Sequence, residues 1–287
     1  KKTWEYNNNR DSLRPNNIEF ELYAYCENKL LHTYKQTMND SWSYTFTNLP
    51  VYANGSKIKY IVDEILVDGY TKEINGFNII NKHNINTTSI SGTKTWVDDN
   101  NRDGIRPDNI IVNLYANGSK IDSKKVSIDN NWKYTFDDLY KKENGKVIEY
   151  SVIEETIKGY NTSYDGFNIT NTHESEKINI NVSKEWINKD NIYNHPDNVK
   201  VKVKGTASGN VVYEKELTLN KDNNWKQELT NLYKYNNGIE INYVITEESI
   251  KDYDVTYNDT LEGNNRNIIM TNTYNPEVKN ITITKTW

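Results

Sequence analysis

A repeated series of motifs divides this chain of 287 residues. The string Lys-x-Trp begins at Lys2, Lys94, Lys184 and Lys285, in steps of 92, 90 and 101 residues. Each of the first three copies is followed by an Arg-Pro or His-Pro pair, a second Trp, an Asn/Asp-Leu corner, a Tyr-x-Val/Ile-x-Glu motif and an apolar segment that closes on Asn. A recurring series indicates a recurring structural unit. We therefore expect three domains, at 1–86, 87–176 and 177–278, and the first strand of a fourth at 279–287.

Composition excludes several classes of protein. Hydrophobic residues are 35% and mean hydropathy is −0.89, yet aromatic residues reach 12%, which suits several small domains better than one large core or a disordered chain. A net charge of −5 argues against nucleic acid as a partner. Cys26 is the only cysteine, so neither a disulfide framework nor a cysteine zinc site is expected. No apolar run is long enough to predict membrane insertion, and the abrupt start at Lys1 suggests a segment of a longer protein.

Turn and strand signals recur within every copy. Short alternating runs, such as residues 110–115 and 132–136, lie between Asn-Gly pairs that begin at Asn54, Asn75, Asn117, Asn144 and Asn237. Roughly seven short strands in each copy, without helical periodicity, predict an all-β fold. We expect a tandem array of Ig-like antiparallel β-sandwich domains. The linkers lack Pro- or Gly-rich spacers, which favours a semi-rigid array.

Three polar residues interrupt the apolar faces of each copy. Alternate side chains share one face of a strand, so Lys184 lies in line with Ile180 and Val182. The same alternation puts a Glu on one strand face with a Tyr and a Val or Ile, at every second position. It also puts an Asn on one face with two apolar residues. The trios are Lys2, Glu64 and Asn81; Lys94, Glu154 and Asn171; and Lys184, Glu247 and Asn272. Because an unpaired buried charge is very costly, each trio requires a chemical explanation.

Two interpretations of each trio stand at this point. In the first, a Lys–Glu ion pair beside a hydrogen-bonded Asn forms a structural network. In the second, desolvation lowers the pKa of an amine and raises that of a carboxyl group, so both are neutral in an apolar pocket. The neutral amine is then a nucleophile, and the protonated carboxyl group can polarise the amide and pass a proton to leaving ammonia. The product would be a Lys–Asn isopeptide bond, formed once per domain.

Several longer motifs point to a known family. They are Lys-x-Trp, Arg-Pro-Asp-Asn (residues 106–109), Asn-Trp-Lys-Tyr-Thr-Phe (131–136), Tyr-x-Val-x-Glu and Phe-Asn-Ile-Thr-Asn-Thr-His (167–173). Over essentially the whole chain, the copies resemble the collagen-adhesin B-type (Cna-B) repeats of Gram-positive surface adhesins and pilins. The third copy departs most, because His195 replaces the Arg and its Glu-to-Asn interval is 25 residues against 17.

The resemblance implies an isopeptide bond between the Lys of the first strand and the Asn of the last, assisted by the Glu. The implied bonds are Lys2–Asn81, Lys94–Asn171 and Lys184–Asn272, with Glu64, Glu154 and Glu247 as the catalytic residues. Closing a loop of about 80 residues would stabilise each domain by roughly 4.5 kcal/mol in the chain-entropy model. Lys285 lacks a partner Glu and Asn, so we expect it to stay unlinked.

Several weaker sequence signals are interpreted as structural features without a ligand. Asp99-x-Asn101-x-Asp103-Gly104 resembles half of a calcium loop, but Ile110 stands where a bidentate Glu belongs, so a solvated loop is favoured over a metal site. The corresponding loop of the third copy is shortened near Asp190. The Trp residues are expected to pack in the core or at strand ends. No cofactor site is predicted.

Two further sets of polar residues lie close to the trios. His83 and His173 follow their Asn by two residues, but Tyr274 takes that position in the third copy, which favours a packing or rim role over catalysis. Glu155 and Glu248 alternate to the opposite strand face from the neighbouring trio Glu and are expected to be solvated.

The leading functional hypothesis is a structural stalk segment of a bacterial cell-surface adhesin, outside the cell and joined to neighbouring domains of a longer polypeptide. It is not an enzyme with turnover, because each site reacts once on itself. One alternative is a module that binds a host matrix protein, and another is a pilus subunit. In the stalk hypothesis a host matrix protein is bound through a domain outside this chain. Repetition without one elaborated domain favours the stalk.

Overall fold

The computed structural model describes residues 1–39, 41–188, 195–275 and 278–286. These residues form two compact units, one of residues 1–93 with 111–155 and the other of residues 94–110 with 156–287. The division passes through the second copy of the sequence repeat. The three copies are called repeats 1, 2 and 3 below. Their secondary structure is almost entirely β-strand, with one short 3-10 helix, Ile128–Asn130.

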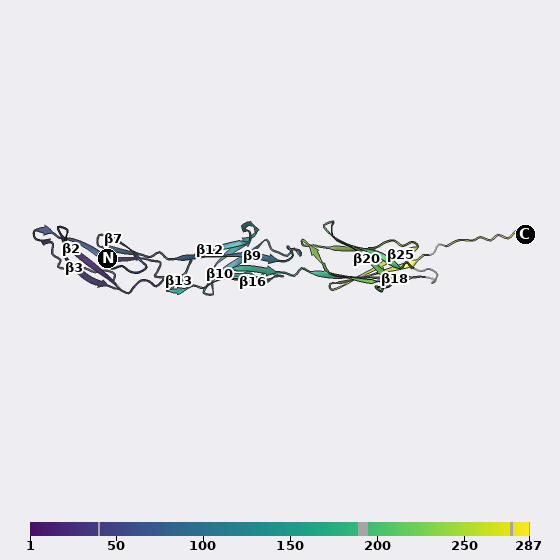
Figure 1. The fold of residues 1–287 in the computed structure, drawn as a ribbon, viewed down its shortest axis with the longest axis horizontal. Helices are drawn as coiled ribbons and strands as arrows, with labels where there is room; N and C mark the ends of the chain where they lie inside the picture. Colours follow the sequence, from purple (N-terminus) through teal and green to yellow (C-terminus); the bar gives the residue numbers. More distant parts are fainter. Residues whose placement is uncertain (40, 189–194, 276–277, 287) are drawn as a thin grey trace. The chain divides into compact units, whose positions relative to one another are not determined.

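Repeat 1 contains two three-stranded sheets and a small hairpin, with strand orders β1-β8-β7, β3-β2-β6 and β4-β5 (Figure 1). Its core joins the two larger sheets, because Phe20 and Leu22 of one pack with Ile79 of the other. The strands are β1 (Lys2–Glu5), β2 (Ile18–Cys26), β3 (Lys29–Met38), β4 (Tyr52–Ala53), β5 (Ser56–Lys57), β6 (Lys59–Glu64), β7 (Thr71–Asn75) and β8 (Asn78–Lys82).

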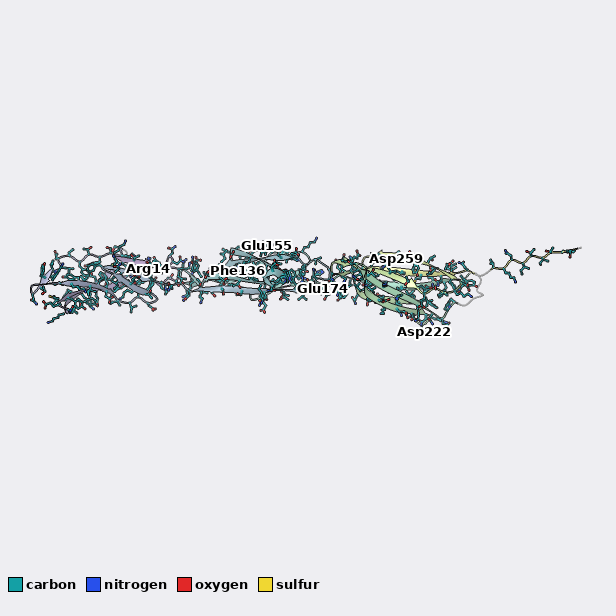
Figure 2. The ribbon with its side chains drawn as sticks, turned by 90° about the horizontal axis from the view of Figure 1, so that it is seen from above. Arg14, Phe136, Glu155, Glu174, Asp222 and Asp259 are labelled. Atoms are coloured by element: carbon teal, nitrogen blue, oxygen red, sulfur yellow. The ribbon has the colours of Figure 1, made fainter. Side chains whose placement is uncertain are left out.

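Repeat 2 has the corresponding sheets, with strand orders β12-β9-β17-β16, β11-β10-β15 and β13-β14. Phe136 of β12, which is labelled in Figure 2, is fully buried, as is Leu114 of β10. The strands are β9 (Thr87–Val97), β10 (Asn109–Ala116), β11 (Ser119–Ser127), β12 (Lys133–Tyr140), β13 (Lys142–Glu143), β14 (Lys146–Val147), β15 (Tyr150–Glu154), β16 (Asn161–Asp165) and β17 (Asn168–Thr172).

Repeat 3 follows the same plan, with strand orders β21-β18-β26-β25, β20-β19-β24 and β22-β23. Its core packs Ile180 and Met270 of one sheet against Val201 and Val203 of the other. The strands are β18 (Lys177–Ile187), β19 (Asn198–Ala207), β20 (Asn210–Asn220), β21 (Lys226–Tyr233), β22 (Tyr235–Asn236), β23 (Ile239–Glu240), β24 (Asn242–Glu247), β25 (Tyr253–Glu262) and β26 (Asn265–Tyr274).

The Asn-Gly pairs lie at hairpin turns, as predicted. Four of them place both residues at positive φ; Asn144 and Gly145, for example, have φ of 49° and 77°. A two-residue turn of this kind matches the twist of the paired strands, and Asn and Gly tolerate it best. These turns position the small hairpins β13–β14 and β22–β23.

The first and last strands of each repeat are parallel neighbours, whereas the other pairings are antiparallel. The parallel pairs are β1 with β8, β9 with β17 and β18 with β26. In all three, the residue paired with the Lys lies two positions before the Asn, so Lys and Asn point to the same face of their sheet. Segments at opposite ends of a repeat's sequence are thereby brought side by side.

Repeat 1 differs from the others at one edge. Residues 41–51 form no strand, whereas the equivalent residues of repeats 2 and 3 form β12 and β21 and pair with the first half of β9 and of β18. Strand β1 has four residues, against eleven in β9 and β18. An opening of about 260 Å³, lined by Phe20, Leu22 and Phe46 among others, lies at this edge.

The long Glu-to-Asn interval of repeat 3 lengthens a hairpin without moving the Asn. Strands β25 and β26 have ten residues each, whereas β16 and β17 have five. The register of Asn272 on Trp186 matches that of Asn171 on Trp96. The insertion therefore extends the free end of the hairpin.

Residues 278–286 form no strand and run on from repeat 3 as an extended segment (Figure 1). Ile281 and Ile283 are 76% and 90% exposed. These exposures show that the side chains of Ile281 and Ile283 are not buried against repeat 3. Trp287 and Asp190 lie outside the described residues. Among the described residues, no helix is long and apolar enough to cross a membrane.

Candidate functional site: the buried Lys-Glu-Asn trios

The three lysines of the trios are buried on the first strand of each repeat. Lys2, Lys94 and Lys184 are 3%, 5% and 5% exposed, and each lies between neighbours that are exposed or half-buried. The three asparagines, on the last strands, are at most 1% exposed. Strand alternation accounts for this burial, since each polar residue continues an apolar stripe.

In repeat 1 the lysine meets the glutamate across the sandwich. The Lys2 Nζ atom lies 3.0 Å and 3.1 Å from the two carboxylate oxygens of Glu64, and both side chains are fully buried. Strand β6 positions Glu64 by pairing it with Phe20 of β2. Asn81 lies on the lysine's own sheet, two residues beyond the position paired with Lys2.

In repeat 3 the glutamate contacts both of the other members. Lys184 Nζ lies 3.2 Å from Glu247 Oε2, and Asn272 Nδ2 donates to Glu247 Oε1 at 2.5 Å. The lysine amine also donates to the Met270 carbonyl oxygen at 3.4 Å. One carboxyl group therefore bridges the amine and the amide, which is the arrangement that proton transfer between them requires.

In repeat 2 all three members are buried on equivalent strands. Lys94 of β9 is paired with Ile169, and Asn171 of β17 is paired with Trp96. Glu154, which is 6% exposed, ends β15 and is paired with Val112 of β10. Each residue has the strand position of its counterpart in repeats 1 and 3.

Burial favours the neutral form of two of the lysines, Lys2 and Lys184. Desolvation lowers the pKa of Lys2 and of Lys184, and the attraction of Glu64 or Glu247 opposes this shift only in part. A lowered pKa reduces the free energy needed to deprotonate the lysine, and the deprotonated amine is the nucleophilic form. An indole ring covers each amine, with Nζ 4.6, 4.3 and 4.5 Å from the ring centres of Trp4, Trp96 and Trp186.

The amide oxygens of the asparagines are buried without a hydrogen-bond donor. This holds for Oδ1 of Asn81, Asn171 and Asn272 among the described residues. A buried polar atom left unsatisfied costs about 1–3 kcal/mol. A protonated Glu side chain could donate to this oxygen, and that bond would also polarise the amide carbon.

A second polar cluster, which the sequence analysis missed, lies beside the site in repeat 2. Asp98 is buried and accepts hydrogen bonds from Arg106 at 2.6 and 3.0 Å, from the Tyr160 hydroxyl at 2.8 Å and from the Asn101 N–H at 2.9 Å. Arg106 also lies over the ring of Trp96, 5.4 Å from its centre. The cluster therefore holds the Arg-Pro loop against the tryptophan that covers Lys94.

In repeats 1 and 3 different residues take the positions of Asp98 and Arg106. Tyr6 stands at the position of Asp98 in repeat 1, and its hydroxyl oxygen accepts from Arg14. In repeat 3 the position is Asn188, which accepts from the Tyr253 hydroxyl at 3.0 Å. There His195 replaces the arginine and stacks on Trp186 at 4.3 Å and 10°. The only sequence signal for these contacts was the Arg-Pro or His-Pro motif.

The two histidines fasten the loop that follows the first strand. His83 Nε2 lies 2.8 Å from Asp11 Oδ2, and His173 Nε2 lies 2.8 Å from Asp103 Oδ2. Their Nδ1 atoms lie 2.7 and 2.8 Å from main-chain carbonyl oxygens. This agrees with the predicted rim role.

In the loop of residues 99–104, which resembles half of a calcium loop, side-chain oxygens accept hydrogen bonds from main-chain N–H groups. Asp103 Oδ2 also accepts from the Glu176 N–H, and Asn101 Oδ1 accepts from the Arg106 N–H. Asp103 and Asn101 therefore stabilise the loop through hydrogen bonds. Among the described residues, no group of three or more His, Cys, Asp or Glu side chains is placed to hold a metal ion.

The stability of repeat 2 should fall as pH rises through the pKa of His173. Burial lowers this pKa, but the bonds to Asp103 and to the Gly159 carbonyl outweigh burial and raise it above the ordinary value. A raised folded-state pKa gives stability that is complete below the unfolded pKa and lost as pH rises through the folded one. We expect the free energy of unfolding of repeat 2 to be about 1 kcal/mol lower at about pH 8 than at about pH 6.

Thermal melts of the wild type and of His173→Gln at several pH values test this expectation. The glutamine variant should lose the pH dependence assigned to His173. NMR titration should place the pKa of His173 above that of a free histidine, and a lower value would contradict the prediction. His32, which is exposed and distant in sequence from the loop, provides the control as His32→Gln.

The fold and the buried trios define a tandem array of Ig-like β-sandwich domains, and comparisons with known proteins identify the family. The Cna protein B-type domain model matches residues 1–82, 90–172 and 180–273. A collagen adhesin of Staphylococcus aureus is 36% identical over 300 residues, covering 100% of this chain and 24% of the adhesin. The chain thus spans about a quarter of the length of that relative.

A solved structure agrees with this match. The crystal structure of two B repeat units of the collagen-binding protein of S. aureus is 35% identical, with a TM-score of 0.54. The match covers 95% of this chain and 74% of that chain. The chain belongs to the Cna protein B-type domain family, and the predicted all-β fold of three tandem domains is confirmed.

Proposed function

We propose that this chain is a structural stalk segment of a bacterial cell-surface adhesin in which every repeat closes a Lys–Asn isopeptide bond on itself. The contact of Glu247 with both Lys184 and Asn272 is the observation that carries the chemistry. Equivalent residues in repeats 1 and 2 extend the proposal to Lys2–Asn81 with Glu64 and to Lys94–Asn171 with Glu154. The identity with a collagen adhesin supports the cellular context.

The reaction begins with a proton transfer from the lysine ammonium to the glutamate, which leaves both groups neutral in a dry pocket. The amine nitrogen then attacks Cγ of the asparagine while the protonated Glu donates to the amide oxygen. A new C–N bond forms to the lysine, the bond from Cγ to Nδ2 breaks, and the lysine's proton reaches the leaving nitrogen through the carboxyl group. One ammonia is released for each bond. Rigid parallel strands supply the high effective concentration that the uncatalysed reaction lacks.

The bond suits a stalk because it joins the first strand to the last. Tension that enters a repeat at one terminus and leaves at the other would pass through the crosslink, so the remaining strands carry little of it. Each site reacts once and has no turnover. The proposal places the chain at the cell surface, between neighbouring domains of a longer polypeptide. Saturable binding of the chain to immobilised collagen would contradict a purely structural role and favour a matrix-binding module.

Intact mass spectrometry tests the bonds directly. The mass should fall short of the sequence mass by about 51 Da, because three ammonia molecules of about 17 Da each are lost. Lys2→Ala should reduce the deficit to about 34 Da, whereas Lys1→Ala, at the exposed neighbouring position, should keep all three bonds. A wild-type chain at full sequence mass would refute the proposal.

A further inference from the structure

A contact between neighbouring repeats is built around Arg10. This residue lies in the loop after β1, and its guanidinium carbon is 4.1 Å from the ring centre of Tyr140 in repeat 2. Its carbonyl oxygen accepts from the Gly145 N–H at 3.0 Å, at the turn of the β13–β14 hairpin. The Arg10 side chain also reaches Glu143 at 3.4 Å, and Asn7 donates to the Tyr140 hydroxyl at 2.6 Å.

The same contact occurs between repeats 2 and 3. The guanidinium carbon of Arg102 is 3.8 Å from the ring centre of Tyr233, and the Arg102 carbonyl oxygen accepts from the Gly238 N–H at 2.9 Å. The Arg102 side chain donates to Asn236 Oδ1 at 3.4 Å. A Cβ atom on Gly104 would lie 2.4 Å from the Gly238 Cα, so the two loops meet backbone to backbone.

We propose that consecutive repeats dock through a dedicated arginine–tyrosine joint. The loop after the first strand of one repeat supplies the arginine, and the next repeat supplies the tyrosine and the Asn-Gly turn. The two joints use equivalent atoms, since Arg10 and Arg102 each lie six residues after a Lys-x-Trp tryptophan. A planar guanidinium over an aromatic face, beside a main-chain hydrogen bond, fixes both the position and the orientation of a contact.

The loop that carries the docking arginine is also held by contacts within its own repeat. His83 holds Asp11, and His173 holds Asp103, each within one residue of the docking arginine. Asp103 also accepts from the N–H of Glu176, which leads into β18 of repeat 3. The loop therefore presents its arginine from a fixed frame, as a docking surface requires.

The joint is directional, and its two halves are distributed unevenly along the chain. Repeat 1 has Pro50 where repeats 2 and 3 have Tyr140 and Tyr233, so it lacks the aromatic half. The corresponding loop of repeat 3, residues 189–194, contains no arginine in its sequence and lies outside the described residues. Repeat 1 therefore supplies only the arginine half, repeat 2 supplies both halves, and repeat 3 supplies the tyrosine half.

The joint limits motion that a short linker alone would allow. Small polar interfaces between domains leave relative motion as the default. The arginine–tyrosine contact and the main-chain bond oppose that motion at two places, whatever covalent chemistry occurs inside each repeat. The proposal is therefore independent of the isopeptide bonds.

Pulsed electron spin resonance on the full chain tests the joint. One spin-label pair replaces the exposed Lys57 and Lys120 and reports on repeats 1 and 2. A second pair replaces the exposed Lys158 and Lys215 and reports on repeats 2 and 3. Both are made with Cys26→Ser. Arg10→Ala should widen the distance distribution of the first pair roughly twofold and leave the second unchanged, whereas Arg102→Ala should do the reverse.

Variants on the other half of the joint make the test decisive. Tyr140→Ala should widen the first distribution as Arg10→Ala does, and the double variant should widen it no further. Arg266→Ala is the matched control, because Arg266 pairs with Asp259 inside repeat 3. Unchanged distributions in both joint variants, or equal widening of both label pairs by either variant, would overturn the proposal. Unchanged far-UV circular dichroism and melting temperatures will show that the repeats stayed folded in every variant.

Discussion

Glu247→Ala is expected to leave repeat 3 folded but without its crosslink, and so to raise the mass of the chain by the ammonia that is no longer lost, in addition to the change of residue. The variant keeps Lys184 and Asn272 but removes the group that contacts both. Without the carboxyl group, no side chain accepts the lysine proton or delivers one to the leaving nitrogen. The free energy of unfolding of repeat 3 should fall by about 4–5 kcal/mol, the chain-entropy contribution of a loop of this length.

The matched control is Glu248→Ala. Glu248 is the next residue along the chain and faces solvent, as does its counterpart Glu155 in repeat 2 (Figure 2). Its replacement should leave both the mass deficit and the melting of repeat 3 unchanged. Calorimetry with tryptic peptide mapping separates the outcomes. A Lys184–Asn272 crosslinked peptide from the Glu247→Ala chain would show that Glu247 is not the proton carrier.

Asp98→Ala should destabilise repeat 2 by about 2–4 kcal/mol, because it leaves the Arg106 guanidinium and the Tyr160 hydroxyl without their shared acceptor. Asp98 is 3% exposed and receives four hydrogen bonds, while Arg106 keeps partial access to water. Asp98→Asn should cost less, since repeat 3 uses Asn188 at this position. Chemical denaturation measures the loss, and Asp108→Ala, at an exposed position in the same loop, is the control.

The contribution of Asp98 should also depend on pH in a defined direction. Burial raises the pKa of Asp98, but hydrogen bonds from Arg106, the Asn101 N–H and Tyr160 outweigh it and hold the pKa below its ordinary value of 3.8. A lowered folded-state pKa gives stability that is present above the unfolded pKa and lost as pH falls through the folded one. The difference between wild type and Asp98→Ala should be constant above about pH 4 and shrink in stronger acid. A difference that grows in acid would contradict this assignment.

Much of the fold was predictable because the signals are local and recur three times. Alternation of Ile180, Val182 and Lys184 predicted a buried lysine, since side-chain direction along a strand has a period of two. The Asn-Gly turns predicted hairpins, since few residues tolerate their backbone angles. Comparing the copies also separated the trios from His83 and His173, whose position holds Tyr274 in repeat 3.

The sequence by itself determined the repeat, the all-β class and the residues that form each buried trio. Tertiary structure decided what those residues meet. Glu247 bridges Lys184 and Asn272 only because the Glu strand faces the parallel first and last strands across the sandwich. The Arg10–Glu143 contact joins residues 133 apart, and the Asp98–Tyr160 bond joins residues 62 apart. Neither contact follows from strand periodicity, because periodicity specifies which face a side chain occupies but not which segment packs against that face.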